Sequence, residues 1–170
     1  MNKETFEIRN AREEDVEEMV KLLAQLFSIE DDFKIDEANQ RNGLAALLRD
    51  HKRSVVKVAK KNNRVIGLCT AQVSISTAQG GLSAGIEDLI VDKTHRGFGI
   101  GTKLLQHITS WALSAGCLRL QLLVDKRNEP ALRFYNTLGW NRTHMVCMQK
   151  TRSAHSMTFN TITQSENSRR

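Results

Sequence analysis

Residues 86–102, which read IEDLIVDKTHRGFGIGT, carry the strongest structural signal in this chain. The apolar run Leu89–Val91 is typical of a buried β-strand. Three glycines at alternate positions follow this strand, namely Gly97, Gly99 and Gly101. The apolar spacing predicts a helix over residues 99–115. Because the first N–H groups of a helix have no partner within it, such a junction forms a binding site for anions such as phosphate.

Two common phosphate-binding loops do not match this junction. A Walker loop ends in Gly-Lys-Ser/Thr, whereas this chain has Gly101-Thr102-Lys103. A dinucleotide fingerprint has the spacing G-x-G-x-x-G, whereas the glycines here give G-x-G-x-G. The cationic residues Lys93, His95, Arg96 and Lys103 are expected to favour an anion near the loop. A glycine-rich turn without any ligand is the alternative interpretation.

A second block of sequence lies at residues 128–140, which read NEPALRFYNTLGW. Pro130 is placed where a helix begins, and Gly139 where it ends. Arg96-x-x-Gly99-x-Gly101 together with this block resembles two motifs of the GNAT superfamily of N-acetyltransferases. The second motif is N-x-x-A-x-x-x-Y-x-x-x-G-F, in which Trp140 replaces the usual phenylalanine. The resemblance extends over residues 5–150, and only these two blocks are specific.

The resemblance implies a binding site for acetyl-CoA and direct transfer of the acetyl group to an amine, without a covalent enzyme intermediate. In such a site, backbone N–H groups of the glycine loop hold the pyrophosphate; here these belong to Arg96, Gly97, Phe98, Gly99, Ile100, Gly101 and Thr102. The end of the strand pairs with the pantetheine arm, here through Leu89, Ile90 and Val91. Asn128 occupies a position that contacts the cofactor, and Tyr135 the position that protonates the departing thiolate.

The reaction also needs a base, for which Glu87 is the candidate. An ordinary amine with a pKa near 10.4 is about 3.4 units from neutrality at pH 7, so its deprotonation costs roughly 4.6 kcal/mol. Strand alternation predicts that Asp88 points to the opposite face from Glu87. Backbone N–H groups such as that of Leu89 are candidates to stabilise the carbonyl oxygen. The alternative role of Glu87 is to hold a polar substrate or an arginine.

The whole chain of 170 residues predicts one domain over residues 1–150 and a polar, disordered tail over residues 151–170. The order of predicted elements is β-α-α-β-β-β-α-β-α-β, which indicates an α/β fold. Its mixed sheet, partly parallel, would carry helices on both faces, as in the GNAT fold. The apolar run Leu118–Val124 predicts a central strand, and Asn141–Lys150 a last strand.

Composition narrows the class of protein. The formal net charge is +6, which suits an anionic ligand, whereas nine aromatic residues and no long Lys/Arg run make a nucleic-acid partner a poor fit. The three cysteines form no metal-binding pattern, so no metal is expected. Val65–Ile86 is uncharged but polar, which favours two strands over a membrane span. The charged N-terminus shows no signal peptide, and a cytoplasmic location is expected.

The acceptor is expected to be set by Phe27–Gly43 and by the later strands. This segment contains five acidic residues, Glu30, Asp31, Asp32, Asp36 and Glu37, which suggests a cationic acceptor. A solvated acidic loop is an equal alternative. The predicted function is therefore acetyl-CoA-dependent acetylation of a primary amine of a small molecule. The alternatives are a protein N-terminal or lysine acetyltransferase and a non-catalytic acyl-CoA-binding module, and a homodimer is expected by analogy with relatives.

Overall fold

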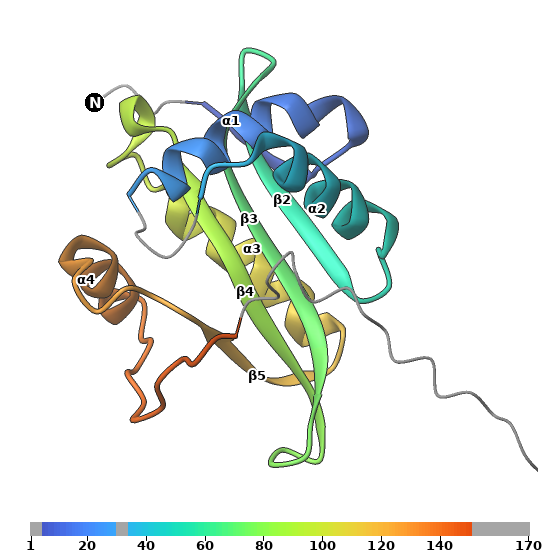
Figure 1. Ribbon diagram of the computed structural model, residues 1–170, viewed down its shortest axis with the longest axis vertical. Coiled ribbons are helices and arrows are strands. Elements are labelled where there is room, and N and C mark those ends of the chain that lie inside the picture. Colours follow the sequence, from blue (N-terminus) through green and yellow to red (C-terminus); the bar gives the residue numbers. More distant parts are fainter. Residues whose placement is uncertain (1–4, 30–33, 151–170) are drawn as a thin grey trace, which may run out of the picture.

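The computed structural model describes residues 5–29 and 34–150, which fold into one mixed sheet covered by helices (Figure 1). The strands are β1 (Glu7–Asn10), β2 (Ser54–Lys61), β3 (Arg64–Ser76), β4 (Gly81–Val91) and β5 (Cys117–Leu122). The α-helices are α1 (Val16–Phe27), α2 (Glu37–Arg49), α3 (Ile100–Ser114) and α4 (Glu129–Thr137). Short 3-10 helices cover Glu13–Asp15 and Lys93–His95.

The sheet has the strand order β1-β2-β3-β4-β5, in which the first four strands are antiparallel and β5 runs parallel to β4. Helix α3 connects the two parallel strands, as a crossover requires. Helices α1 and α2 cover one face of the sheet and α3 covers the other. The prediction of a mixed sheet with helices on both faces is therefore confirmed.

Each face of the sheet is closed by its own apolar cluster. On the α1–α2 face, Met19 and Leu44 pack against Leu68 of β3. On the α3 face, Ile100 and Leu104 pack against alternate residues of the same strands. The uncharged segment between residues 65 and 86 forms most of β3, a turn and the start of β4, which confirms the two predicted strands. Among the described helices, none has the length and apolar character needed to cross a bilayer.

A buried ion cluster joins the N-terminal strand and α1 to the sheet. The carboxylate of Asp15 is fully buried and accepts hydrogen bonds from Arg9 at 2.7 Å and Lys60 at 3.0 Å. The backbone N–H of Arg12 donates to the same carboxylate at 2.9 Å. Burial alone would raise the pKa of Asp15, but these three donors outweigh it and lower the pKa to about 2.

Strand β4 contains a β-bulge. Its pairing with β3 proceeds from Leu89 opposite Cys69 directly to Ile86 opposite Ala71, so that Glu87 and Asp88 together face the single residue Thr70. The parallel pairing with β5 ends at Ile86, so residues 87–91 of β4 have no β5 partner. The sheet therefore opens between β4 and β5 at the carboxyl end of β4, which is visible in Figure 1.

Two predictions about the C-terminal part are wrong. The strand predicted over residues 118–124 is an edge strand of the described sheet, because polar residues alternate along it and Leu118 is 63% exposed. Residues 141–150 form no strand, since they pair with no neighbour, and Met145 is 86% exposed. Strand propensity alone does not create a strand when no adjacent edge is paired. The predicted tail over residues 151–170 lies outside the described residues.

Candidate active site

The glycine loop between β4 and α3 exposes backbone donors at a helix N-terminus. Gly97 has a φ of +84° and Gly99 a φ of +77°, a conformation that residues with a side chain rarely adopt. Gly99 caps α3 without any side-chain hydrogen bond, and the first bond within the helix runs from the Lys103 N–H to the Gly99 carbonyl at 3.0 Å. The N–H groups of Ile100, Gly101 and Thr102 therefore have no acceptor within α3.

Several side chains around the glycine loop contact other parts of the protein. Asp92 accepts hydrogen bonds from the hydroxyl and the backbone N–H of Thr94, and these bonds hold the pKa of Asp92 well below its usual range. Arg96 donates through Nε to the carbonyl of Val91 at 3.0 Å. The ammonium of Lys103 lies 5.9 Å from the centre of the Phe6 ring.

Helix α4 packs beside this loop and carries the predicted acid. Asn128 accepts a hydrogen bond from the Ala131 N–H at 3.1 Å, so its side chain begins the helix in addition to any contact with a ligand. A Cβ added at Gly101 would lie 3.4 Å from the Phe134 ring, which shows how closely α3 and α4 approach. The half-buried Tyr135 has edge-to-face contacts with Phe134 at 5.3 Å and with Trp140 at 6.1 Å.

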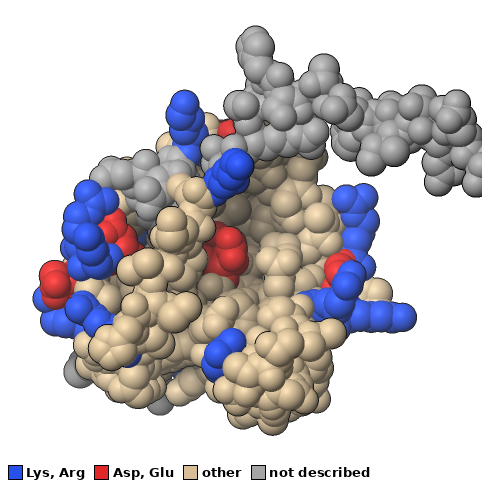
Figure 2. Space-filling view, turned by 60° about the horizontal axis from the view of Figure 1, so that its bottom comes forward, with Lys and Arg blue, Asp and Glu red and all other residues tan. Residues whose placement is uncertain are grey.

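A cavity of about 590 Å³ lies between the α1–α2 layer and the sheet, and we call it the α1–α2 cavity. Five elements contribute to its walls, through residues that include Phe27, Gln40, Leu44, Ser54, Gln72 and Glu87. Asp88 lines the same cavity as Glu87. Figure 2 shows acidic side chains inside a hollow on this side of the molecule, surrounded mostly by uncharged residues.

The β-bulge overturns the prediction that Asp88 faces away from Glu87. Because two residues of β4 occupy one position of the pairing, alternation is interrupted and both carboxylates line the α1–α2 cavity. Asp88 accepts a hydrogen bond from the Thr70 hydroxyl at 2.8 Å. Burial and the neighbouring Glu87 charge raise the pKa of Asp88, although the Thr70 hydroxyl opposes this shift. Sequence alternation alone could not reveal this second carboxylate.

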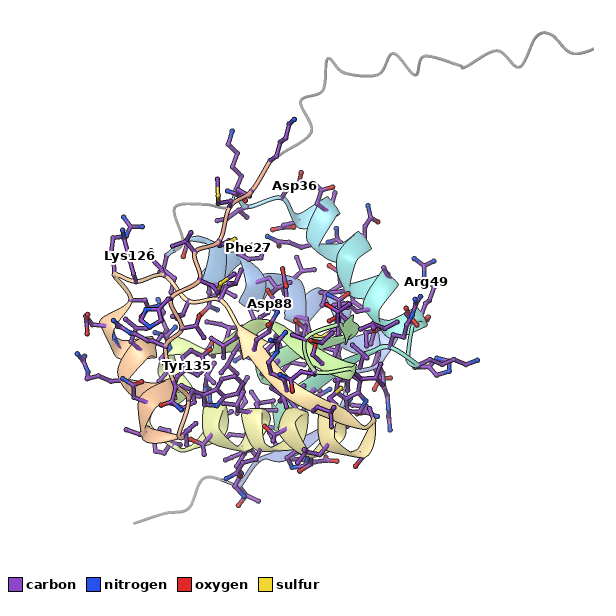
Figure 3. The ribbon with its side chains drawn as sticks, turned by 90° about the horizontal axis from the view of Figure 1, so that it is seen from below. Phe27, Asp36, Arg49, Asp88, Lys126 and Tyr135 are labelled. Carbon is purple, nitrogen blue, oxygen red and sulfur yellow. The ribbon has the colours of Figure 1, made fainter. Side chains whose placement is uncertain are left out.

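The predicted site residues lie around the opening between β4 and β5, on both sides of the sheet. In the view from below, Asp88 lies between Phe27 on the α1 side and Tyr135 on the α4 side (Figure 3). Leu89, Ile90 and Val91 belong to the part of β4 that β5 leaves unpaired. Gln40 is another cavity residue that the sequence did not single out. Of the acidic segment, residues 30–32 lie outside the described part of the chain.

The model of the "Acetyltransferase (GNAT) family" matches residues 16–140, which include both the glycine loop and α4. The chain belongs to this family. A solved structure described as a transcriptional regulator from Bacillus halodurans C-125 superposes with a TM-score of 0.77 and 27% identity. The match covers 86% of this chain and all of that one.

Two curated relatives show how far the similarity extends along the chain. A glucosamine 6-phosphate N-acetyltransferase of Trypanosoma brucei brucei is 29% identical over 142 residues, which are 82% of this chain and 90% of the relative. A thialysine N-epsilon-acetyltransferase of Bos taurus is 30% identical over 141 residues, which are 78% of this chain and 82% of the relative. This GNAT protein is therefore an N-acetyltransferase that transfers acetyl groups to amines, and its family uses acetyl-CoA as co-substrate.

The glycine loop fits a diphosphate group, because its left-handed glycines expose backbone donors and no side chain caps α3. A Cβ at Gly97 or Gly99 would meet no atom within 4 Å, so the space beside both residues is open. Within residues 5–29 and 34–150, no three His, Cys, Asp or Glu side chains come together in an arrangement suited to a metal ion.

Proposed function

We propose that this protein acetylates the primary amine of a small, cationic molecule that binds in the α1–α2 cavity. The observation that carries this proposal is the β-bulge, which turns Glu87 and Asp88 into one cavity beside the opening of the sheet. A cavity of about 590 Å³ suits a small molecule better than a peptide chain. The names of the two curated relatives describe small amine substrates, which supports the same size class.

The acetyl donor is expected to bind along the glycine loop and the end of β4 that β5 leaves unpaired. Backbone N–H groups of residues 96–102 would hold its pyrophosphate, and Leu89–Val91 would pair with its pantetheine arm. The bound donor supplies a thioester whose carbonyl carbon accepts the amine. Asn128 lies at the start of α4, next to the proposed donor site. Its side-chain oxygen caps the helix, so its amide nitrogen is the group that would contact the donor.

Glu87 is the proposed base. Its side chain makes no hydrogen bond or ion pair with any other described residue, whereas Asp88 is held by Thr70. The Glu87 carboxylate accepts a proton from the substrate ammonium, directly or through a water molecule. The free amine then forms the new C–N bond as the C–S bond breaks, and the nitrogen releases its surplus proton to solvent as the amide forms. Asp88 contributes negative charge that attracts the ammonium to this position.

Tyr135 is the proposed acid. The departing sulfur takes the proton of the Tyr135 phenol, which recovers a proton from solvent. The aromatic contacts of Tyr135 with Phe134 and Trp140 restrict the ring to one orientation beside the loop. Charge that develops on the carbonyl oxygen needs an N–H donor, for which the unpaired part of β4 is the nearest source of backbone groups.

A thiol-release assay with acetyl-CoA and a panel of small amines and lysine peptides tests this proposal. We expect release with small cationic amines that depends on Glu87 and Tyr135. Faster release with peptides than with any small amine would contradict the proposed acceptor class. CoA binding without turnover of any amine would favour the non-catalytic module. A cytoplasmic location and a homodimer stay predictions, which fractionation and sedimentation would check.

A further inference from the structure

Gln40 occupies a core position of α2 although it carries a polar amide. Gln40 and Leu44, one turn later, are the two buried residues of this helix, and both line the α1–α2 cavity. Gln40 is buried, with only 8% of the residue exposed. A leucine or methionine at such a position would bury apolar surface without any polar group to satisfy.

The amide of Gln40 has no hydrogen-bond partner within the described part of the chain. Its Oε1 and Nε2 atoms are both buried and both lack one. The backbone N–H of Gln40 has its own partner, since it donates to the Asp36 carbonyl at 2.9 Å. The side-chain amide is therefore not needed to satisfy the backbone of this residue. A buried amide without partners destabilises the fold, so the side chain gains stability when it turns toward the cavity, whose wall Gln40 helps to form, and meets a ligand that supplies them.

The other groups of the cavity limit what this ligand is. Among the described residues that line it, four are carboxylates, Asp36, Asp50, Glu87 and Asp88, and one is a cation, Lys34. Asp36 accepts hydrogen bonds from Asn39, Asp50 pairs with Arg53 at 3.1 Å, and Asp88 is held by Thr70. This leaves Glu87 for the ammonium of the acceptor, while the excess of negative charge disfavours a phosphorylated or carboxylated molecule.

We propose that Gln40 is a specificity-determining residue whose side-chain amide binds a hydroxyl group of the acceptor amine. A hydroxyl both donates and accepts, so it satisfies Oε1 and Nε2 without adding charge. The favoured substrate class is therefore a hydroxylated, cationic primary amine, such as an amino alcohol or an unphosphorylated amino sugar. This inference rests on the proposed function, since it assumes that the acceptor occupies the α1–α2 cavity.

The test compares matched acceptors in the wild type and in Gln40→Met, a substitution of similar length without the amide. The pairs are 1,3-diamino-2-propanol with 1,3-diaminopropane, and glucosamine with cyclohexylamine. The ratio of kcat/KM within each pair is expected to fall roughly 10-fold to 100-fold in Gln40→Met, because the hydroxyl loses its buried partner. Comparing ratios cancels the different basicities of the amines. Asn42→Met, on the exposed side of the same helix, is expected to leave the ratios unchanged.

Thermal unfolding separates this role from a structural one. We expect Gln40→Met to melt at the same temperature as the wild type or higher, because it removes an unsatisfied buried amide. A melting temperature lowered by several degrees would mean that the protein itself satisfies the amide, and would overturn the inference. Equal kcat/KM ratios in the wild type and Gln40→Met would overturn it as well.

Binding measurements make the inference testable even if no amine is acetylated. Calorimetric titration of the wild type and Gln40→Met with the same four amines measures their binding affinity without acetyl transfer. A hydroxyl preference that is present in the wild type and lost in Gln40→Met would support the inference while the proposed function fails. Turnover of both members of each pair without any hydroxyl preference would support the proposed function and overturn the inference.

Discussion

The glycine loop and the α1–α2 cavity differ in how the chain builds them. The loop uses consecutive residues, and its donors are backbone N–H groups fixed by Gly97 and Gly99. The cavity collects side chains from α1, α2, β2, β3 and β4, which are as far apart in sequence as Phe27 and Asp88. The backbone donors of the loop suit phosphate groups such as those of acetyl-CoA, whereas the shape and charge of the cavity depend on the side chains that form its walls.

This difference predicts separable defects. Changes in the loop should alter the affinity for acetyl-CoA, and changes in the cavity should alter the selection and deprotonation of the amine. Tyr135 contacts the α3 side of the sheet and Glu87 faces the α1–α2 side, so the proposed reaction would join the two regions at the opening between β4 and β5. The following experiments test whether the two regions are as independent as their construction suggests.

The largest effect is expected at Tyr135, where both regions meet. Tyr135→Phe keeps the ring contacts with Phe134 and Trp140 but removes the phenol that we propose protonates the departing sulfur. We expect kcat to fall roughly 100- to 1,000-fold with the KM values for amine and acetyl-CoA almost unchanged. Steady-state kinetics with both substrates varied check this. A rise in either KM with an unchanged kcat would assign the phenol to binding alone.

Substitutions of the two carboxylates in the bulge should affect different kinetic parameters. Glu87→Gln is expected to lower kcat roughly 100-fold, because it removes the proposed base. Asp88→Asn should mainly raise the KM for the amine, since it removes negative charge and keeps the shape of the side chain.

The pH profile separates these roles further. Because the pKa of Asp88 is raised, its charge is lost as the pH falls through a value above that of an ordinary aspartate. We expect amine affinity to weaken in this range in the wild type and to be flat in Asp88→Asn. If Asp88→Asn lowers kcat more than Glu87→Gln does, the base is Asp88.

Both regions depend on the same scaffold, which acid should disrupt. The pKa of Asp15 is about 2 in the fold and near 3.8 without its partners, so its contribution is present above pH 4 and is lost as the pH falls toward 2. The loss amounts to about 2 kcal/mol. Urea unfolding of the wild type between pH 7 and pH 2.5 should show it. Asp15→Asn should lower stability at pH 7 and remove much of this acid dependence; an unchanged slope would contradict the ion cluster's role.

The smallest effect is expected from one methyl group in the loop. Gly99→Ala places a side chain at a φ of +77°, which costs about 1 to 2 kcal/mol and shifts the donors of α3. We expect the KM for acetyl-CoA to rise roughly 10-fold with the amine KM unchanged, because 1.4 kcal/mol corresponds to a factor of ten. Gly80→Ala introduces a similar strain at a φ of +63° in the β3–β4 turn and serves as the control. Equal effects of both variants on KM would indicate general destabilisation.

The sequence predicts elements built from neighbouring residues better than it predicts the pairing of distant strands. It located the loop, the start of α4 at Asn128–Pro130 and the hairpin of β3 and β4, because each depends on neighbouring residues. It placed β5 in the centre of the sheet and predicted a strand over residues 141–150, both wrongly, because pairing partners lie far away in the chain.

The sequence by itself determined the sites of backbone chemistry, since glycine spacing, helix caps and apolar periodicity act over a few residues. Only the tertiary structure decided the side-chain chemistry of the cavity. A single extra residue in β4 turned Asp88 beside Glu87, and the packing of α2 against the sheet buried the amide of Gln40. Register and helix packing are set by contacts between distant segments, and no local pattern encodes them.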